Sequence, residues 1–168
     1  MAMMCRIDAL AVVVAAAAIL AGGPARADDP PFVSGSIGIF DVDHHEKATS
    51  FAADYRPAQK FWIFKPHAGA FVTTERSLYG YAGLLVDIYF GRRLVLTPST
   101  AFGLYDKGNG KDLGSVVEFR SGAELAYRFD NRSRLGLGFH HLSNAGIGDR
   151  NPGTEILSVI FSYPLGGD

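Results

Sequence analysis

A histidine, a serine and a glutamate lie close together near the C-terminal end of the chain, as His141, Ser143 and Glu155. A serine hydroxyl attacks an ester only when a base takes its proton, and histidine titrates in the right pH range for that role. A carboxylate that binds the other ring nitrogen fixes the tautomer and stabilises the imidazolium that forms. These residue types therefore indicate ester hydrolysis by a serine nucleophile, provided that the fold brings them together.

The segments around these residues alternate in the manner of β-strands. In residues 133–143 and 155–163, most of the large apolar side chains occupy odd-numbered positions. Side chains two residues apart on a strand point to the same face. His141, Ser143 and Glu155 are all odd-numbered, so the alternation places all three on the apolar face of their strands.

A hairpin of these two segments predicts a specific contact. If Phe139 stands opposite Leu157, then His141 stands opposite Glu155, with Cβ atoms about 4.5–5.5 Å apart and within reach of a hydrogen bond. Ser143 lies about 6.5 Å from His141 along a regular strand. A direct hydrogen bond between His141 and Ser143 therefore requires the strand to curl or end near Leu142.

Asn151, Pro152 and Gly153 read as a tight turn between the two segments. Proline presets φ at the second position of such a turn, and glycine tolerates a positive φ at the third. An asparagine that the turn holds in place could direct its amide at a developing oxyanion.

Two-residue alternation continues through the rest of the chain, between short clusters of Gly, Asn, Asp, Pro and Lys. It predicts an all-β protein. Eight segments show the pattern: residues 33–42, 50–57, 61–73, 78–90, 94–105, 113–129, 133–143 and 155–163. An even number of strands, several long enough to cross a bilayer, suits an eight-stranded antiparallel transmembrane β-barrel.

Residues 113–129 favour the membrane barrel over a soluble β-sandwich or lipocalin-like barrel, whose strands alternate in the same way. Their odd positions are mostly apolar, whereas the even positions carry four charges: Glu118, Arg120, Glu124 and Arg128. A soluble barrel would bury these charges in an apolar core at high cost. In a membrane barrel they line the lumen, and apolar side chains face lipid.

The first residues predict export. Arg6, an apolar run and the sequence Ala25-Arg26-Ala27 form a signal-peptide pattern over residues 1–27, with an uncleaved anchor as the alternative. Residues 28–168 then form a single barrel domain. The only cysteine is Cys5, so the exported chain has no thiol nucleophile.

The C-terminal stretch also carries a specific motif: His-x-Ser-Asn-Ala-Gly at residues 141–146, Asn-Pro-Gly at 151–153, a glutamate at 155, and a last strand that ends Tyr163-Pro164. It resembles the lipid A 3-O-deacylase (PagL-type) family of Gram-negative outer membranes, with weaker similarity back to about residue 94. The resemblance implies an eight-stranded outer-membrane barrel that removes the 3-O-linked acyl chain of lipid A without a metal or other cofactor.

By matched position, the resemblance implies a base, a nucleophile and an orienting acid, namely His141, Ser143 and Glu155. It further implies two oxyanion donors and a supporting residue, namely Asn151, the backbone amide near Ala145, and Asn144. The implied partners are lipid A, within lipopolysaccharide, and outer-membrane lipids; association as a homodimer stays open. The alternatives are a non-catalytic structural or adhesion barrel, or a soluble β-domain that binds a small hydrophobic ligand.

The overall charge favours neither sign, with 16 Lys and Arg against 17 Asp and Glu. It gives no reason to expect a nucleic-acid partner. The pairs His44-His45 and His140-His141 suggest a metal, but adjacent strand residues point to opposite faces and do not chelate readily. We therefore expect no metal site, and a lumen or rim position for His140.

Overall fold

The computed structural model describes residues 29–43 and 47–166, which form antiparallel β-strands joined by turns and loops. The expected signal peptide and the pair His44-His45 lie outside the described residues. The strands are β1 (Phe32–Phe40), β2 (Ala48–Arg56), β3 (Lys65–Thr73), β4 (Leu78–Leu85), β5 (Ile88–Phe90), β6 (Leu94–Asp106), β7 (Val117–Arg128), β8 (Arg134–Ser143) and β9 (Thr154–Pro164). Within the described ranges, no helix is long and apolar enough to span a membrane.

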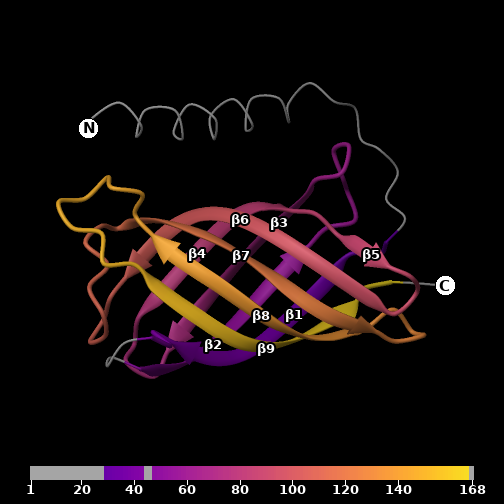
Figure 1. The fold of residues 1–168 in the computed structure, drawn as a ribbon, viewed down its shortest axis with the longest axis horizontal. Helices are drawn as coiled ribbons and strands as arrows, with labels where there is room; N and C mark the ends of the chain where they lie inside the picture. Colours follow the sequence, from indigo (N-terminus) through magenta and orange to yellow (C-terminus); the bar gives the residue numbers. More distant parts are fainter. Residues whose placement is uncertain (1–28, 44–46, 167–168) are drawn as a thin grey trace.

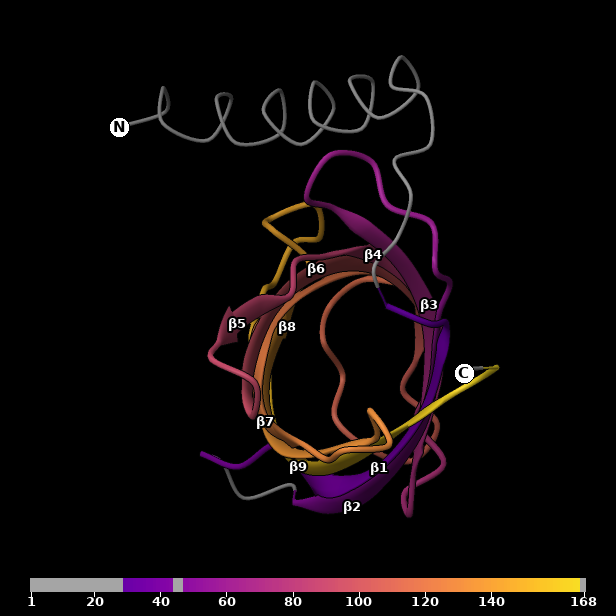
Figure 2. The ribbon, with the colours of Figure 1, turned by 90° about the vertical axis from the view of Figure 1, so that its right-hand side faces the viewer.

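The strands close into a barrel. Their order is β4-β3-β2-β1-β9-β8-β7-β6-β5, and β4 also pairs with β6, so the sheet has no open edge (Figures 1 and 2). Both β4 and β5 pair with β6, because the chain breaks its regular pairing only at Val86 and Asp87. The two together form one of the eight strands of a closed antiparallel barrel, as the sequence predicted.

The outer surface of the barrel is an apolar belt, and the alternation in the sequence produces it. On β8 and β9 the odd-numbered residues point outward, and Leu137, Phe139 and Phe161 are each about half exposed. The even-numbered residues of the same strands point inward and are mostly buried. The predicted faces of these strands are therefore confirmed.

The interior is filled in two ways. Near the end that carries the loop between β8 and β9, aromatic and aliphatic side chains form the core: Phe40, Ala48, Phe71, Tyr79, Tyr81, Ala101, Tyr105, Leu113, Leu142 and Ile156. Toward the other end, charged side chains pair across the lumen, and Arg134 bonds Asp87 at 2.8 Å while Lys65 bonds it at 2.9 Å. The charged interior predicted for residues 113–129 is present, with Glu118 and Glu124 both buried.

Three predicted strands differ from the structure by more than a shift of one or two residues at an end. Residues 61–64 form a tight turn closed by Phe61 and Phe64, so β3 begins only at Lys65. The predicted strand 78–90 is interrupted, because Asp87 leaves the ladder to meet the buried cations of the lumen. Residues 113–116 precede β7, and Leu113 turns into the core, where it is 1% exposed, instead of facing outward.

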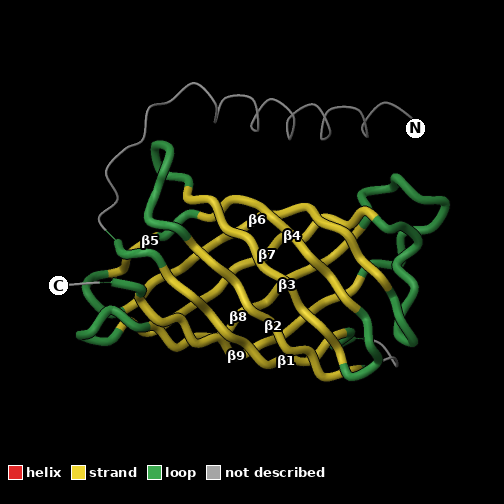
Figure 3. Tube along the Cα trace, turned by 180° about the vertical axis from the view of Figure 1, so that it is seen from behind, coloured by secondary structure: helices red, strands yellow, loops and turns green. Residues whose placement is uncertain are grey.

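The two ends of the barrel carry different connections. The described chain termini lie at one end, with the short connections at residues 91–93 and 129–133 (Figure 3). The opposite end carries the longer loops, residues 107–116 between β6 and β7 and residues 144–153 between β8 and β9. His141, Ser143 and Glu155 belong to this second end, because they flank the longer loop of the last hairpin.

Candidate active site

The hairpin of β8 and β9 brings His141 and Glu155 together. The register places Phe139 opposite Leu157 and His141 opposite Glu155, as the alternation predicted. Nδ1 of His141 and Oε1 of Glu155 are 2.9 Å apart. A carboxylate can only accept, so Nδ1 carries the proton in this pair, and Nε2 is left as the basic nitrogen.

Both side chains lie on the outer surface, among the apolar belt. The His141 side chain is 44% exposed and that of Glu155 is 20% exposed. The ring can therefore be reached from outside the barrel while its acid partner is largely covered.

Ser143 ends β8 on the same outer face as His141. The strand stays regular up to Ser143, which pairs with Phe119 of β7, so β8 does not curl but ends one residue after Leu142. Among the described residues, no hydrogen bond joins Ser143 to His141. Bonds between a nucleophile and its base are often long in free enzymes and shorten in the substrate complex.

Asn144 holds the loop that follows Ser143. It is fully buried, and its Nδ2 donates to the carbonyl oxygens of Leu113 at 2.9 Å and Arg150 at 2.6 Å. Its Oδ1 accepts from the Gly146 N–H at 2.9 Å. Both polar atoms of the Asn144 side chain thus make hydrogen bonds that hold the loop, and the supporting role implied by the motif stays a prediction.

Two donors in the same loop remain available. The N–H of Asn144 donates to Oδ1 of Asn151 at 3.0 Å, which occupies the oxygen of that amide and leaves its nitrogen to donate elsewhere. Ala145 has a left-handed φ of 52°, and within the described chain its N–H has no hydrogen-bond partner. Both groups sit next to Ser143 in a loop that Asn144 fixes.

Gly153 ends the loop before β9, and a side chain there would meet the histidine. Its φ is +62°, the positive value expected for this glycine, but residues 151–153 are irregular backbone and the turn of this loop lies at residues 145–146. A Cβ at this position would lie 2.9 Å from Cε1 of His141 and 3.4 Å from Nε2. The turn motif in the sequence indicated the backbone conformation, but it gave no sign of the contact with the imidazole.

A buried ion pair fixes the start of β9, and no local pattern in the sequence indicated it. Oδ1 of Asp41, just after β1, accepts from Lys111 Nζ at 2.6 Å and from Thr154 Oγ1 at 3.1 Å. The Asp41 N–H donates to the carbonyl oxygen of Glu155 at 2.8 Å. The backbone of Glu155 is therefore anchored to two other loops of the barrel.

A second outward-facing serine, which the sequence analysis did not single out, lies beside the histidine. Ser121 of β7 pairs with His141, and His141 pairs with Glu155, so the three residues form one row across three strands. Ser121 is exposed on the outer surface. Its position at an odd number in residues 113–129 was the only signal available in the sequence.

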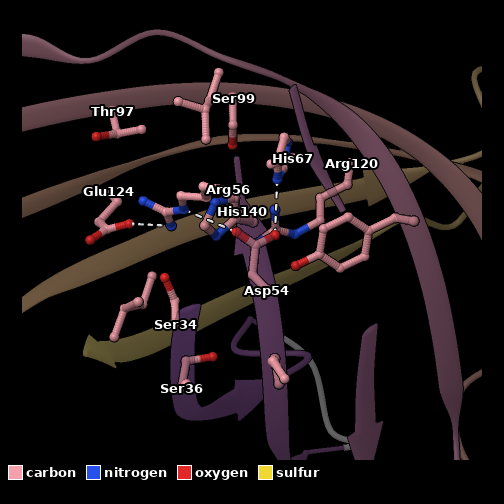
Figure 4. A pocket seen from close by; sticks show the side chains of 16 residues that line it. Ser34, Ser36, Asp54, Arg56, His67, Thr97, Ser99, Arg120, Glu124 and His140 are labelled. Carbon is pink, nitrogen blue, oxygen red and sulfur yellow. Dashed lines mark hydrogen bonds and ion pairs between the residues drawn. The ribbon is translucent and has the colours of Figure 1, made fainter. Parts of the chain in front are cut away.

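The interior of the barrel holds a separate polar cluster (Figure 4). Asp54 accepts from Arg56 at 2.9 Å and from His67 at 3.0 Å, and Arg56 also bonds Glu124 at 2.8 Å. His140 lines the same space, in agreement with the predicted lumen position. The cavity between these groups measures about 30 Å³, enough for about one water molecule. It contains none of the outward-facing residues around His141.

Metal ligands do not gather in the part of the chain that the structure describes. There, no group of three or more His, Cys, Asp or Glu side chains is arranged to hold an ion. The chemistry available to His141, Ser143 and Glu155 from their own side chains is proton transfer and nucleophilic attack.

Comparison with known proteins agrees with this geometry. A family model described as lipid A 3-O-deacylase (PagL) matches residues 45–164. A curated relative, the lipid A deacylase PagL of Bordetella bronchiseptica, is 36% identical over 53 residues, which cover 32% of this chain. The matched stretch spans only 30% of that relative.

Solved structures show the same barrel. The crystal structure of the outer membrane enzyme PagL aligns with a TM-score of 0.63 at 18% identity, covering 80% of this chain and 99% of that one. A de novo designed transmembrane β-barrel aligns with a TM-score of 0.58 at 10% identity, covering 83% and 99%. At such low identity these likenesses support the fold alone.

Proposed function

The chain belongs to the lipid A 3-O-deacylase (PagL) family, and from that membership we propose that it is a serine esterase of the outer membrane that hydrolyses the 3-O-linked acyl chain of lipid A. The observation that carries the proposal is the 2.9 Å bond between His141 and Glu155, on the outer face of the barrel beside Ser143. Acyl chains of a membrane lipid lie against that face.

In the proposed reaction, Oγ of Ser143 attacks the ester carbonyl while Nε2 of His141 takes its proton. Glu155 stabilises the imidazolium through Nδ1. The negative charge that develops on the carbonyl oxygen is met by the Ala145 N–H and the Asn151 side-chain amide. Collapse of the intermediate breaks the bond to the sugar oxygen, which takes the proton from His141.

A water molecule completes the cycle. His141 takes a proton from the water as it attacks the acyl-serine, and returns that proton to Oγ as the fatty acid leaves. The overall products are one free carboxylic acid and lipid A with a free 3-hydroxyl group. The site must therefore admit water from the polar surface while it holds the acyl chain from the membrane, and a position at the rim of the barrel meets both needs.

The longer loops support an outer-leaflet location for the site. In bacterial outer-membrane barrels the periplasmic turns are short and the extracellular loops are longer. His141, Ser143 and Glu155 flank the loop 144–153 at the long-loop end. This orientation places the proposed nucleophile at the level where the glucosamine esters of outer-leaflet lipid A lie.

Ser143→Ala tests the proposed nucleophile. The variant should form a folded, heat-modifiable barrel and lose deacylation by roughly three orders of magnitude or more, because the proposed acyl-enzyme forms on the Ser143 Oγ. Mass spectrometry of lipid A from expressing cells, and of lipid A treated with purified protein, measures the loss of one hydroxyacyl chain.

Ser121→Ala is the matched control, since Ser121 is also an exposed serine beside His141. It should keep activity within about tenfold of the wild-type protein. An inactive Ser121→Ala protein together with an active Ser143→Ala protein would identify Ser121 of β7 as the nucleophile. Unmodified lipid A with the wild-type protein would instead favour a non-catalytic barrel.

A further inference from the structure

Two exposed cations share one carboxylate beside the proposed site. Arg150, in the loop between β8 and β9, has Nη2 3.5 Å from Oδ2 of Asp112. Lys107, in the loop between β6 and β7, has Nζ 3.2 Å from the same oxygen. Because both nitrogens contact one atom, the two cations lie close enough together for a single phosphate group to bridge them.

The carboxylate between them is held in its charged form. Oδ1 of Asp112 accepts from the Gly114 N–H at 2.9 Å, and this bond, together with Lys107, holds the pKa of Asp112 below its usual range. One negative charge against two positive charges leaves the cluster with an excess positive charge. The Asp112 carboxylate keeps the two cations side by side.

The two cations are available to a ligand. The side chains of Arg150 and Lys107 are 68% and 56% exposed, and exposed ion pairs of this kind contribute little net stability. Lys111, in the same loop as Lys107, is instead largely buried against Asp41. A phosphate could therefore bind the exposed cations without the loss of a structural contact.

Arg150 is also fixed relative to the proposed oxyanion donors. Its carbonyl oxygen accepts from Asn144 Nδ2 at 2.6 Å, and Asn151 follows directly in the chain. The backbone from which the Arg150 side chain extends is thus held by the same buried asparagine that follows Ser143. A group bound by Arg150 is then held by the loop that also carries the proposed oxyanion donors.

We propose that Arg150 and Lys107 form a phosphate-binding subsite that selects substrates in which the ester and a phosphate are carried by the same acylated glucosamine headgroup. The proposal rests on the proposed function. Arginine and lysine both bind phosphate through charge-assisted hydrogen bonds, and arginine can do so with two parallel bonds. The headgroup, held by its phosphate, presents its 3-linked ester to Ser143.

The test compares two substrates, an acylated glucosamine 1-phosphate and the same lipid without its phosphate, in one zwitterionic detergent. For the phosphorylated lipid, the double variant Arg150→Ala, Lys107→Ala should raise KM about tenfold or more and change kcat little. For the lipid without phosphate, KM and kcat of the double variant should match those of the wild-type protein. The control Arg92→Ala, Arg132→Ala removes two exposed cations at the opposite end, and should leave both KM values unchanged.

Equal losses on both substrates would overturn the proposal, since the two residues would then serve the site in general. A loss that appears only when anionic phospholipid is added, whatever the substrate, would also overturn it, because the cations would then bind neighbouring lipids. The proposal would also be overturned if the double variant had a KM for the phosphorylated lipid equal to the wild-type value.

Binding to Ser143→Ala protein separates this proposal from the esterase itself. In isothermal titration, the Kd for the phosphorylated lipid should be about tenfold or more lower than the Kd for the lipid without phosphate. Adding Arg150→Ala and Lys107→Ala to the Ser143→Ala protein should remove this difference. If the wild-type protein hydrolyses neither lipid but this difference remains, the esterase function fails and the phosphate subsite stands. Equal Kd values for the two lipids would overturn the subsite.

Discussion

At the scale of single residues, His141 is held from two directions. Glu155 binds Nδ1, and Gly153 lies against the ring edge that carries Cε1 and Nε2. The first contact sets the tautomer, and the second limits how far the ring can tilt toward the loop. The two contacts restrict the orientation of the ring, as the proton transfer that we propose for Nε2 would require.

Gly153→Ala should lower deacylase activity by about tenfold or more, because the new Cβ would have to displace the imidazole from its place. The positive φ should also lower the free energy of unfolding by about 1–2 kcal/mol, because a residue with a Cβ is strained in this conformation. Initial rates with purified protein and urea unfolding in detergent measure the two effects.

Gly91→Ala is the control for backbone strain alone. Its φ is +68°, similar to that of Gly153, but an added Cβ would meet nothing within 4 Å. It should show a similar stability loss with activity unchanged. If Gly153→Ala lost stability but kept its full rate, the contact with the ring would have no part in catalysis.

The sequence was sufficient to place those residues whose positions follow from a local pattern. Parity and hairpin register were enough to place His141 opposite Glu155, and the turn motif indicated a positive φ at Gly153. The row that Ser121 forms with them could not be foreseen, because it depends on the register between β7 and β8, which no motif specifies. The direct contact between Ser143 and His141 stays a prediction for the substrate complex.

At the scale of strands and loops, the site depends on a connection between distant parts of the chain. Asp41 and Lys111 form an ion pair in which the side chains are 0% and 11% exposed, and it joins the end of β1, the loop before β7 and the start of β9. Lys111 is a charged partner 2.6 Å from Asp41 in this buried position, and the loss of such a partner is strongly destabilising.

Lys111→Met should therefore lower the free energy of unfolding by about 3 kcal/mol or more, and lower kcat through displacement of Glu155. Lys111→Arg keeps the charge and should recover much of both. Lys107→Met removes an exposed ion pair from the same loop and should cost less than about 1 kcal/mol. Urea unfolding of the three proteins in detergent gives the comparison, and equal losses for both methionine variants would contradict the anchoring role.

The strand boundaries that were predicted incorrectly also depend on contacts between residues far apart in the sequence. The alternation continued through residues 113–116, yet the backbone there leaves the strand, because the carbonyl of Val116 accepts from Tyr105 and that of Leu113 accepts from Asn144. Likewise, Asp87 interrupts a strand because Arg134 and Lys65 reach it from across the lumen. Contacts between residues far apart in sequence are invisible to a local pattern.

At the scale of the whole molecule, the barrel has an apolar outside, a polar inside and two unlike ends. The proposed orientation places the loops 107–116 and 144–153 outside the cell. Because Cys5 is the only cysteine in the sequence, single-cysteine variants can test this orientation.

Asp149→Cys, in the longer loop, should react with a large, membrane-impermeant maleimide reagent on intact cells. Asp130→Cys, in a short turn at the opposite end, should react only after the outer membrane has been permeabilised. Gel mobility of the labelled protein measures both. The reverse pattern would place the site at the periplasmic leaflet and would contradict the proposed access to lipid A.

The apolar belt around His141 has a consequence for kinetics. The interior of the barrel is filled, and the proposed nucleophile lies on its outer wall, so a substrate arrives by lateral diffusion in the plane of the membrane and not from the aqueous phase. The concentration that governs the rate is then the mole fraction of substrate among the surrounding lipids. Dilution with an inert lipid would slow turnover even when the amount of substrate per litre stays constant.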